Sequence, residues 1–424
     1  MHEPIINVND QAPGGLGTAP SLQQRGCRAD VEPDPLAAAK VVVLTHYLPP
    51  YMERVLQVLS EQVPQMQVWL SVPLEPNRQY AVKWEGLQVR VQRSWMLRRS
   101  WRHRTGFADE LYVHIPYDTL PELMRERPDL VFSYELGFRS LASALYRCWN
   151  RRSRLALCVC VSEHTERGRG GARWLLRRAL LRSADAITFN GPSCRRYLES
   201  LGVPTHKLFP FSYAADDRVL PSGAPSDTPA PNRSLLVVGQ LIERKGIVPV
   251  LNSLTAHCQQ HPEQTWAVSF IGTGPLEATI RNWRSPANLQ LALLGSLPPQ
   301  ELAQNWSRFG VLLFPTLADE WGLVVNEALR AGLPVIGSRY AQASSTLIEP
   351  GCNGWVYTPD LSGDLSRCLN DLWHQSAEQL TRMRQASRSS VSHLTCRASA
   401  DAAASMLRQL YLDTLKSTTT ALSR

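Results

Sequence analysis

The sequence lacks the features of several protein classes. No apolar run approaches the roughly 18–20 residues that a membrane-spanning helix needs, so a transmembrane protein is excluded. The start of the chain, Met1-His2-Glu3-Pro4, lacks the basic and apolar segments of a secretory signal. Only 19% of the residues are charged and 44% are hydrophobic, which excludes a largely disordered chain. The length of 424 residues predicts two or three globular domains.

Cysteine is sparse and irregularly spaced. The nine cysteines are odd in number, and none of them forms a C-x-x-C pair. Cys158 and Cys160 lie in an apolar run, and we interpret them as small core residues. We therefore expect a reduced, cytoplasmic compartment.

Positive charge is unevenly distributed along the chain. Residues 37–215 carry 26 basic and 15 acidic side chains, a net charge of +11, whereas residues 216–424 carry 17 of each. An excess confined to the N-terminal half indicates an anionic partner, such as nucleic acid, a phosphorylated substrate or an acidic membrane surface. A solvated basic face of an arginine-rich protein is an equally open interpretation, since only five of the 45 basic residues are lysine.

Short apolar runs alternate with helical stretches along most of the chain, and this predicts an α/β protein with parallel, doubly wound sheets. In the first half, strands are expected at residues 41–44, 67–71, 130–133, 155–161 and 186–189, and helices at 51–63, 137–151, 172–183 and 192–201. In the second half, strands are expected at residues 234–238, 266–271, 289–294, 311–314, 334–336 and 355–357. Residues from about 361 to 415 are expected to be helical throughout.

A proline-rich break divides the alternating pattern into two domains. We expect a disordered tail at residues 1–36, an α/β domain at 37–215, a linker at 216–233, a second α/β domain at 234–390 and a helical segment at 391–424. Two such domains leave a cleft between them, and ligands of these folds bind at the C-terminal ends of the strands.

The most informative segment covers residues 315–336, which predict a strand end, an acidic loop, a helix that begins after a glycine, and a next strand. Gly322 allows the backbone to come close to a ligand. The free N–H groups of Leu323 and Val324 at the helix start favour an anion such as a diphosphate. The segment therefore predicts a phosphate-binding helix start.

Two acidic positions flank this helix start. Glu327 lies about one and a half turns into the helix, where a carboxylate can accept hydrogen bonds from two vicinal hydroxyls. Asp319 lies in the preceding loop, on the other side of the expected ligand. The alternative is that Asp319, Glu320 and Glu327 only cap and solvate the helix.

This segment resembles the E-x7-E region of the GT4 family of retaining glycosyltransferases, which have the GT-B fold, with Asp319 and Glu327 at the two acidic positions. Three further segments are similar to the family pattern in order and spacing. Residues 237–246 resemble its V-G-R-L-x-x-x-K-G, residues 270–276 its V-G-x-G-P-L and residues 353–360 its G-x-L-V-x-P-x-D close. The resemblance is strong over residues 234–360 and weak over residues 40–213, where residues 45–50 and 162–166 carry it.

The sequence departs from the family pattern at two positions. The first acid is usually glutamate and here is Asp319, unless Glu320 takes that role. The arginine of G-R-L is replaced by Gln240, and Arg244 beside Lys245 is expected to supply the missing charge. Two cations in one loop suit a diphosphate, and without an anion they would oppose the dipole of the following helix.

His164 follows the expected strand at residues 155–161 and is predicted to face the cleft. The family places a histidine in such a loop beside the donor sugar, and the alternative is a surface histidine. Glu163 and Glu166 are alternatives for an acid–base role in this loop. A further turn, Gly272-Thr273-Gly274, lacks the third glycine of a dinucleotide motif and is interpreted as a tight turn near a nucleotide.

Two basic and apolar segments, residues 93–104 and 173–182, resemble interfacial segments that lie on anionic lipid. For residues 173–182 we favour an ordinary core helix over a membrane contact. For residues 93–104, which mix Trp with Arg, we favour membrane or acceptor binding. No base-reading motif is present, so nucleic acid is not an expected partner.

The resemblance implies an enzyme that transfers a sugar from a nucleotide-sugar donor to a sugar or lipid-linked sugar acceptor with retention of configuration, in the biosynthesis of cell-surface polysaccharide or glycolipid. It implies no metal and no cofactor other than the donor substrate, and a cytoplasmic protein at the inner face of a membrane. The expected catalytic residues are Asp319, Glu327, His164 and Lys245. The expected donor-binding residues are Gly239, Arg244, Lys245, Gly322, Leu323, Val324 and Glu327.

Two alternatives remain open at this point. A GT-B sugar-nucleotide epimerase would use the same nucleotide site but needs acid–base groups across the cleft. A catalytically silent nucleotide-sugar-binding subunit is the other, supported by the shortened acid Asp319 and the missing arginine at Gln240.

Overall fold

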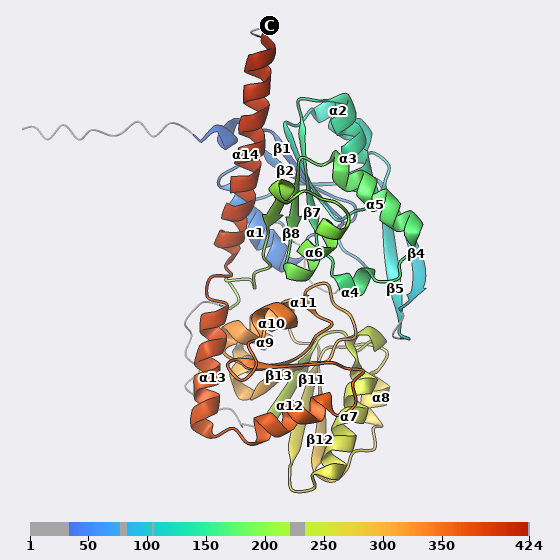
Figure 1. Ribbon diagram of the computed structural model, residues 1–424, viewed down its shortest axis with the longest axis vertical. Coiled ribbons are helices and arrows are strands. Elements are labelled where there is room, and N and C mark those ends of the chain that lie inside the picture. The colour runs from blue at the N-terminus through green and yellow to red at the C-terminus, as the bar shows by residue number, and fades with distance from the viewer. Residues whose placement is uncertain (1–33, 77–82, 104–105, 221–233, 423–424) are drawn as a thin grey trace, which may run out of the picture. The chain divides into compact units, whose positions relative to one another are not determined.

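The computed structural model describes residues 34–76, 83–103, 106–220 and 234–422, and two parallel sheets organise this part of the chain (Figure 1). The expected tail up to residue 33, and the linker from residue 221 to residue 233, lie outside the described residues. We call residues 35–215 the N-lobe and residues 234–390 the C-lobe. The predicted class, α/β with two doubly wound domains, is confirmed.

The N-lobe is built on seven parallel strands in the order β3-β2-β1-β6-β7-β8-β9. The central strands are buried on both faces, and this is why their sequences are continuous apolar runs. The strands are β1 (Val41–Thr45), β2 (Met66–Leu70), β3 (Gln88–Val91), β6 (Leu130–Tyr134), β7 (Arg154–Val159), β8 (Ala186–Phe189) and β9 (Leu208–Pro210). The helices are α1 (Pro50–Ser60), α2 (Thr119–Glu126), α3 (Phe138–Trp149), α4 (Glu163–Glu166), α5 (Gly171–Ser183) and α6 (Pro192–Ser200), with short 3-10 turns η1 (Pro35–Ala38) and η2 (Thr205–Lys207).

A two-stranded antiparallel hairpin, β4 (Ser94–Arg102) with β5 (Ala108–Pro116), stands apart from the N-lobe sheet. The Trp- and Arg-containing segment at residues 93–104 is therefore mostly a β-strand. Nearly every residue of β4 is exposed or half-buried, because a two-stranded ribbon has no second layer to cover both of its faces. Near the tip, the backbone N–H of Ala108 donates to the Glu243 carboxylate at 3.0 Å, so the hairpin reaches the C-lobe.

The C-lobe is built on six parallel strands in the order β12-β11-β10-β13-β14-β15. The strands are β10 (Ser234–Val238), β11 (Trp266–Ile271), β12 (Leu289–Gly295), β13 (Val311–Phe314), β14 (Val335–Ser338) and β15 (Gly354–Tyr357). The helices are α7 (Ile247–Gln260), α8 (Glu277–Arg281), α9 (Pro299–Asn305), α10 (Leu323–Ala331) and α11 (Gln342–Leu347), with short turns η3 (Glu243–Lys245) and η4 (Trp306–Arg308). The bounds predicted for β10, β11 and β13 are confirmed.

The C-terminal region is helical, as predicted for residues 361–415, and short breaks divide it into three helices. It forms α12 (Asp364–Trp373), α13 (Ala377–Ser390) and α14 (Cys396–Leu422). A new helix begins after Ser376 because its side chain accepts a hydrogen bond from the backbone N–H of Gln379 and completes a capping box. Periodicity alone did not reveal these breaks. None of the described helices combines the length and the apolar composition needed to cross a membrane.

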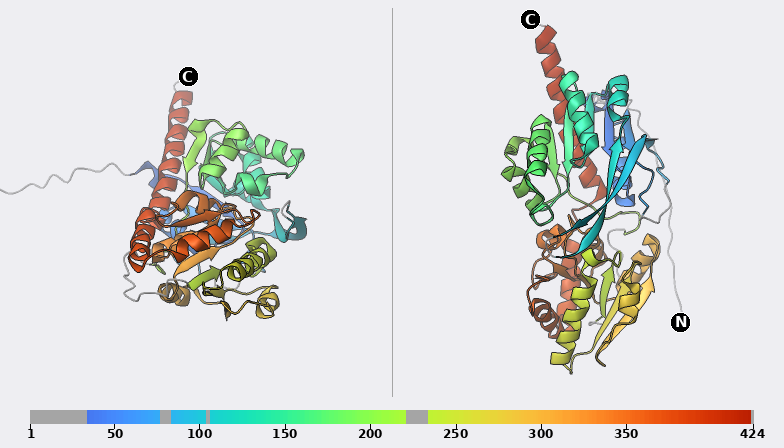
Figure 2. Two further views of the ribbon diagram at one scale, coloured as in Figure 1. Left: turned by 60° about the horizontal axis from the view of Figure 1, so that its bottom comes forward. Right: turned by 90° about the vertical axis from the view of Figure 1, so that its right-hand side faces the viewer.

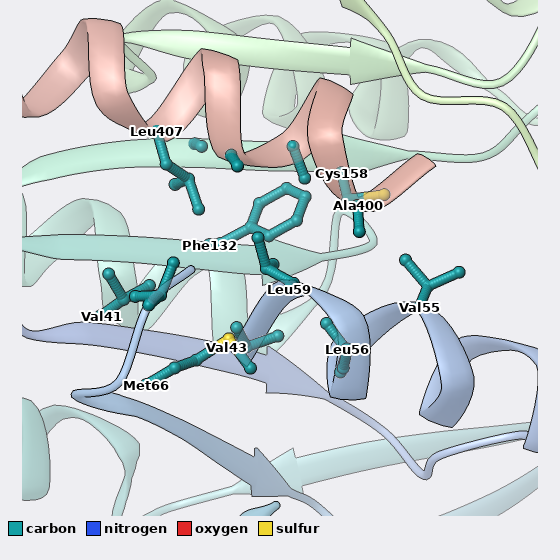
Figure 3. Close-up of a cluster of buried hydrophobic side chains, with 14 of the residues drawn as sticks. Val41, Val43, Val55, Leu56, Leu59, Met66, Phe132, Cys158, Ala400 and Leu407 are labelled. Atoms are coloured by element: carbon teal, nitrogen blue, oxygen red, sulfur yellow. The ribbon is translucent and has the colours of Figure 1, made fainter. Parts of the chain in front are cut away.

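Helix α14 returns to the N-lobe and completes one of its two hydrophobic cores. Figure 3 shows Ala400 and Leu407 of α14 beside Leu59 of α1 and Phe132 of β6. The same core contains Leu36, which is fully buried although it lies in the predicted disordered tail. This core therefore includes segments that are far apart in the sequence: η1, which precedes β1, and α14, which follows the C-lobe.

Candidate functional site

A cavity of about 620 Å³ is lined by residues of both lobes and opens at the C-terminal ends of β10 and β13. Strand ends of this kind are where ligands of doubly wound sheets bind. The C-lobe lines it with Val238, Gly239, Arg244, Lys245, Phe314, Ala318, Asp319, Glu320, Trp321, Gly322, Leu323, Val324 and Glu327. The N-lobe lines it with Tyr47, Pro49, Pro50, Tyr51, Trp101, Glu110, Leu111, Thr165, Arg169 and Tyr213. Apart from His164, every residue predicted for the site lines this cavity.

The helix start of α10 depends on Gly322. Its φ is +98°, a left-handed conformation that favours glycine, and a Cβ there would lie 2.6 Å from the Phe314 ring. The glycine lets the loop turn tightly over the end of β13 before α10 begins. The first N–H groups of α10, including those of Leu323 and Val324, lack intrahelical acceptors and point out of the helix start at the cavity.

Asp319 is held in an ionic contact with the basic loop of η3. Its Oδ2 lies 2.5 Å from Lys245 Nζ and 3.9 Å from Arg244 Nη1. Burial opposes ionisation of Asp319, but the charges of Lys245 and Arg244 outweigh it and lower the pKa of the carboxyl. Asp319 is therefore ionised and fixes the Lys245 ammonium at the cavity wall.

The backbone ties the two motif loops to one another. The Arg244 carbonyl accepts a hydrogen bond from the Leu317 N–H at 2.8 Å, and the Arg244 guanidinium donates to the Ala318 carbonyl at 3.2 Å. Lys245 Nζ also lies 5.4 Å from the centre of the Phe314 ring. Gln240, which replaces the family arginine, does not line the cavity, whereas Arg244 does. The positive charge at this loop thus comes from Arg244 and Lys245.

The turn between β11 and α8 packs against the same edge of the sheet. A Cβ at Gly272 would lie 1.9 Å from the Gly239 carbonyl oxygen, so only glycine allows this contact. The N–H of Gly272 donates to the Gly295 carbonyl at 2.7 Å. The glycines of this turn therefore support the loop at the end of β10 rather than bind a dinucleotide.

Glu327 is a half-buried carboxylate without an internal partner. It lies on the second turn of α10, and no hydrogen bond or ion pair to it is found within the described residues. Burial, with a smaller contribution from the charge of Asp216, raises its pKa to about 7. A carboxylate in this condition has unused acceptor capacity directed at the cavity.

Glu320 lies where the two lobes meet. Its backbone carbonyl accepts hydrogen bonds from Asn190 Nδ2 at 3.1 Å and from Gln342 Nε2 at 3.0 Å, while its side chain remains accessible from the cavity. Enclosure by the cavity walls, together with the charges of Glu135, Glu166 and Asp319, raises its pKa to about 8. Of the two candidates for the first acidic position, Asp319 is ion-paired, whereas no ion pair of Glu320 is found among the residues that the structure describes.

Gln342 joins the lobes beside this point. It is buried, its Oε1 accepts from the Cys194 N–H at 2.8 Å, and its Nε2 donates to Asn190 Oδ1 at 3.1 Å. Since Cys194 and Asn190 belong to the N-lobe, one C-lobe side chain holds the two lobes together beside Glu320. Sequence reasoning gave no signal for this residue.

His164 lies outside the 620 Å³ cavity and lines a neighbouring one of about 570 Å³. Its Nε2 is 2.9 Å from the Leu317 carbonyl oxygen, and its ring stacks on Tyr340 with centroids 4.0 Å apart. Burial lowers its pKa. The residue after it, Thr165, lines the larger cavity, so His164 lies behind one wall of the site.

The two acidic alternatives in the His164 loop are engaged in ion pairs. Glu166 contacts Arg177 at 2.5 Å and Arg173 at 3.3 Å, and Glu163 contacts Arg196 at 2.7 Å. The structure supplies an N-lobe group that the sequence did not single out, Arg169, and places it beside Trp101 of the segment at residues 93–104, for which membrane or acceptor binding was favoured. Arg169 lies 3.8 Å above the centre of the Trp101 ring, and this pair forms part of the cavity wall.

Two family models match the chain. Residues 35–214 match the glycosyl transferase 4-like domain, and residues 224–390 match the glycosyl transferases group 1 domain. Among curated relatives, the chain is 25% identical over 213 residues to an exopolysaccharide phosphotransferase of Streptomyces coelicolor, covering 48% of this chain and 21% of the relative. It is 28% identical over 133 residues to a sulfoquinovosyl transferase of Arabidopsis thaliana, covering 31% of this chain and 25% of the relative. The matches thus span a quarter or less of these relatives' length.

Solved structures share the fold over nearly the whole chain. Anabaena HepE in complex with UDP is similar with a TM-score of 0.65 at 14% identity, covering 87% of this chain and 100% of that one. Sucrose-phosphate synthase from Thermosynechococcus elongatus gives a TM-score of 0.61 at 16% identity, covering 88% and 99%. With both lobes matched by glycosyltransferase models and the fold shared with these structures, the chain belongs to the GT4-type glycosyltransferases of the GT-B fold.

Proposed function

We propose that this protein transfers a sugar from a nucleotide-sugar donor to an acceptor, with retention of anomeric configuration, in the biosynthesis of cell-surface polysaccharide or glycolipid. One observation carries the proposal. A single cavity combines a glycine-initiated helix start, two adjacent cations and a carboxylate with unused acceptor capacity. These three groups suit the phosphates and the ribose of a nucleoside diphosphate.

The donor is proposed to lie along the C-lobe wall. The N–H groups at the start of α10, with Arg244 and Lys245, suit the diphosphate, because amide donors and cations together neutralise its charge. Glu327 suits the two ribose hydroxyls, which are donors for its free carboxylate. The UDP held by the similar Anabaena structure supports a nucleoside diphosphate as the common part of the ligand.

In the proposed reaction, the bond between the sugar C1 and the diphosphate oxygen breaks, and a bond forms between C1 and the acceptor oxygen on the same face. The acceptor's proton passes to the leaving phosphate, so no protein nucleophile is required. Negative charge grows on the leaving diphosphate as the bond breaks. Lys245, held by Asp319, is fixed in advance to stabilise that charge, which is an electrostatic contribution to the transition state.

We also propose that the reaction needs no metal ion and no separate cofactor, since Arg244, Lys245 and the α10 start provide positive charge at the expected diphosphate position. Activity measured with and without a chelator tests this. Loss of transfer on chelation, restored by a divalent cation, would contradict it.

The acceptor is proposed to be a sugar or a lipid-linked sugar that enters from the N-lobe side. The net charge of +11 on residues 37–215 supports association with an anionic membrane surface, where a lipid-linked acceptor would be found. The eight cysteines of the described residues are all free thiols, which supports a reduced, cytoplasmic location.

A thermal-shift screen with UDP-, GDP-, ADP- and dTDP-sugars tests the donor assignment, because a ligand that binds only the native state raises the melting temperature. We expect one nucleotide series to stabilise the protein and the corresponding Glu327→Ala variant to lose that shift. No shift with any sugar nucleotide would contradict the proposed site.

The products distinguish the proposed transferase from its two alternatives. Release of the nucleotide together with a new glycosidic bond of the donor's anomeric configuration, read by NMR, supports the retaining transferase. An epimerase would convert the donor into a different sugar, and a silent binding subunit would leave the donor intact with every acceptor offered.

A further inference from the structure

Helix α3 of the N-lobe exposes most of its large apolar side chains, although Tyr146 and Ala144 are buried. Its polar residues Arg139, Ser140 and Ser143 are buried against the lobe. Its exposed large apolar residues have a spacing of three or four residues, which places them in one stripe: Phe138, Leu141, Leu145 and Trp149. Trp149, at the end of the stripe, is 67% exposed.

The neighbouring helix α5 also exposes large apolar side chains. Trp174, Leu175 and Leu176 follow one another on its outer side, and Leu175 is 64% exposed. Helices α2, α3 and α5 and the hairpin lie on one side of the N-lobe in both Figure 1 and the right-hand view of Figure 2. We call the surface formed by the exposed side chains of α3 and α5 the α3–α5 face.

The apolar exposure is concentrated on the N-lobe. Among the described residues, 18 large apolar side chains are exposed, and all but four of them lie between Val91 and Leu176. Side chains of this kind scattered singly need no explanation, but a group of them on two helices in contact favours a surface that binds something apolar.

The charge around the α3–α5 face is positive. Arg151 and Arg152 follow α3 directly and Arg182 lies in the last turn of α5, and no hydrogen bond or ion pair to these three side chains is found within the described residues. The acidic groups on the neighbouring elements are already paired. Glu166 contacts Arg173 and Arg177. Asp185 contacts Arg147 at 2.9 Å, and Glu122 and Glu126 contact Arg90 and Arg125.

We propose that the α3–α5 face docks on the surface of an anionic lipid bilayer. Leucine, phenylalanine and tryptophan beside arginines are the composition of protein segments that lie in the interface between headgroups and acyl chains. The unpaired arginines complement the negative headgroups. A second protein molecule would also cover the apolar residues, but it would have to supply acidic groups at the rim of the face. Protein association through this face is therefore one of the outcomes that the test distinguishes.

The face also connects with the cavity, and this step rests on the proposed function. The hairpin carries the exposed Trp95 and Leu97 near the base of β4, and contributes Trp101, Glu110 and Leu111 to the cavity wall. A bilayer bound at the α3–α5 face would therefore lie on the side of the N-lobe that carries the hairpin, where the acceptor is proposed to enter the cavity. The acceptor class that this arrangement favours is a sugar carried on a membrane lipid.

Vesicle co-sedimentation of the full chain tests the docking without any donor or acceptor. We expect binding to vesicles of phosphatidylcholine mixed with phosphatidylglycerol, and weak binding to phosphatidylcholine alone. The Arg151→Gln/Arg152→Gln variant should bind about 25-fold more weakly, since each basic residue near an anionic surface changes binding about fivefold. The Leu145→Gln/Trp149→Gln variant should lose about tenfold or more, because two large apolar side chains no longer enter the interface.

Matched controls lie on the C-lobe. Leu294→Gln/Leu361→Gln removes two exposed leucines, of which Leu361 is 60% exposed, and Arg281→Gln/Arg284→Gln removes two exposed arginines. Both control variants should bind vesicles as the unchanged protein does. Equal losses in the control and α3–α5 variants would overturn the assignment of the face, and so would absence of binding to anionic vesicles or concentration-dependent self-association abolished by Leu145→Gln/Trp149→Gln.

The outcome is independent of the donor site. Vesicle binding without any thermal shift by sugar nucleotides would leave the docking face in place and contradict the proposed function. A thermal shift by a sugar nucleotide without vesicle binding would support the proposed function and contradict the docking face.

Discussion

The two lobes share a sheet architecture but differ in what they present to their surroundings. The C-lobe has its candidate site at the strand ends, where Asp319 and Lys245 of two loops and Glu327 of α10 line one cavity. The N-lobe has its excess charge and its exposed apolar side chains on the outside, over α3, α5 and the hairpin. One lobe is organised around a small ligand and the other around a large surface, a division that suits a soluble donor and an acceptor fixed to something extended.

The largest effect is expected from weakening the packing of α14 against the N-lobe core. Leu407 is fully buried there, and Leu407→Ala should lower the free energy of unfolding by about 2–5 kcal/mol, since a large core side chain is lost and a cavity remains. Urea unfolding measures this. The control is Leu412→Ala on the same helix, where the side chain is 37% exposed and a change of only a few tenths of a kcal/mol is expected.

Lys245→Ala tests whether the C-lobe loop acts on the reaction rather than on the fold. Turnover should fall by about 10²–10³-fold, as expected when a fixed group that stabilises transition-state charge is removed. The melting temperature should change little, because Lys245 contacts Asp319 at a cavity wall and not in the core. Lys40→Ala, an exposed N-lobe lysine, is the control. A variant that loses stability and keeps turnover would make Lys245 structural.

Glu327→Ala should weaken donor binding while leaving acceptor binding unchanged. Each charge-assisted hydrogen bond to the ribose hydroxyls is worth about 1.5–3 kcal/mol, so the dissociation constant should rise at least tenfold. Calorimetric titration with the nucleotide sugar found in the thermal-shift screen measures it. An unchanged donor affinity would reject the role assigned to Glu327.

The smallest expected effect is the pH dependence of donor binding, which tests the protonation of the Glu327 carboxyl. The pKa of Glu327 is raised from its ordinary value of 4.5 to about 7, so the folded protein without ligand binds that proton more tightly than the unfolded chain does. Its protonated form therefore contributes stability that is present below pH 4.5 and is lost as the pH rises through about 7. Donor affinity should move the opposite way and increase over this range, because the ionised carboxylate is the better acceptor. Glu327→Gln should flatten both curves.

The sequence predicted the C-lobe site more completely than the N-lobe. Gly322, Glu327 and Lys245 could be predicted because they belong to short motifs in which local backbone geometry and chemistry are set within a few residues. His164 shows the limit of that reasoning. Its loop was placed correctly after β7, but the packing against Leu317 and Tyr340 that turns it away from the cavity depends on residues more than 150 positions later.

The exposed face and the hairpin of the N-lobe could not be predicted from the sequence, because they depend on tertiary packing. The apolar spacing in α3 is the same as that of a helix with a buried stripe, and only the fold shows that Arg139 and Ser143 take the inner side. The hairpin was missed because β4 alternates poorly, with exposed side chains on both of its faces. The expected core helix at residues 173–182 is a helix, but Trp174 and Leu175 lie outside its buried side.

The return of α14 to the N-lobe has a consequence for the order in which the protein is made. The hydrophobic core of the C-lobe has all its residues once the chain has been synthesised to Leu394. One of the two hydrophobic cores of the N-lobe still lacks its residues from Cys396 to Leu410 at that stage, whereas the buried residues of the other core end at Val203. Domains ordinarily fold in the order of their synthesis, with the N-terminal one first. Here the C-lobe has all of its core residues before the N-lobe does, because one of the two N-lobe cores waits for α14.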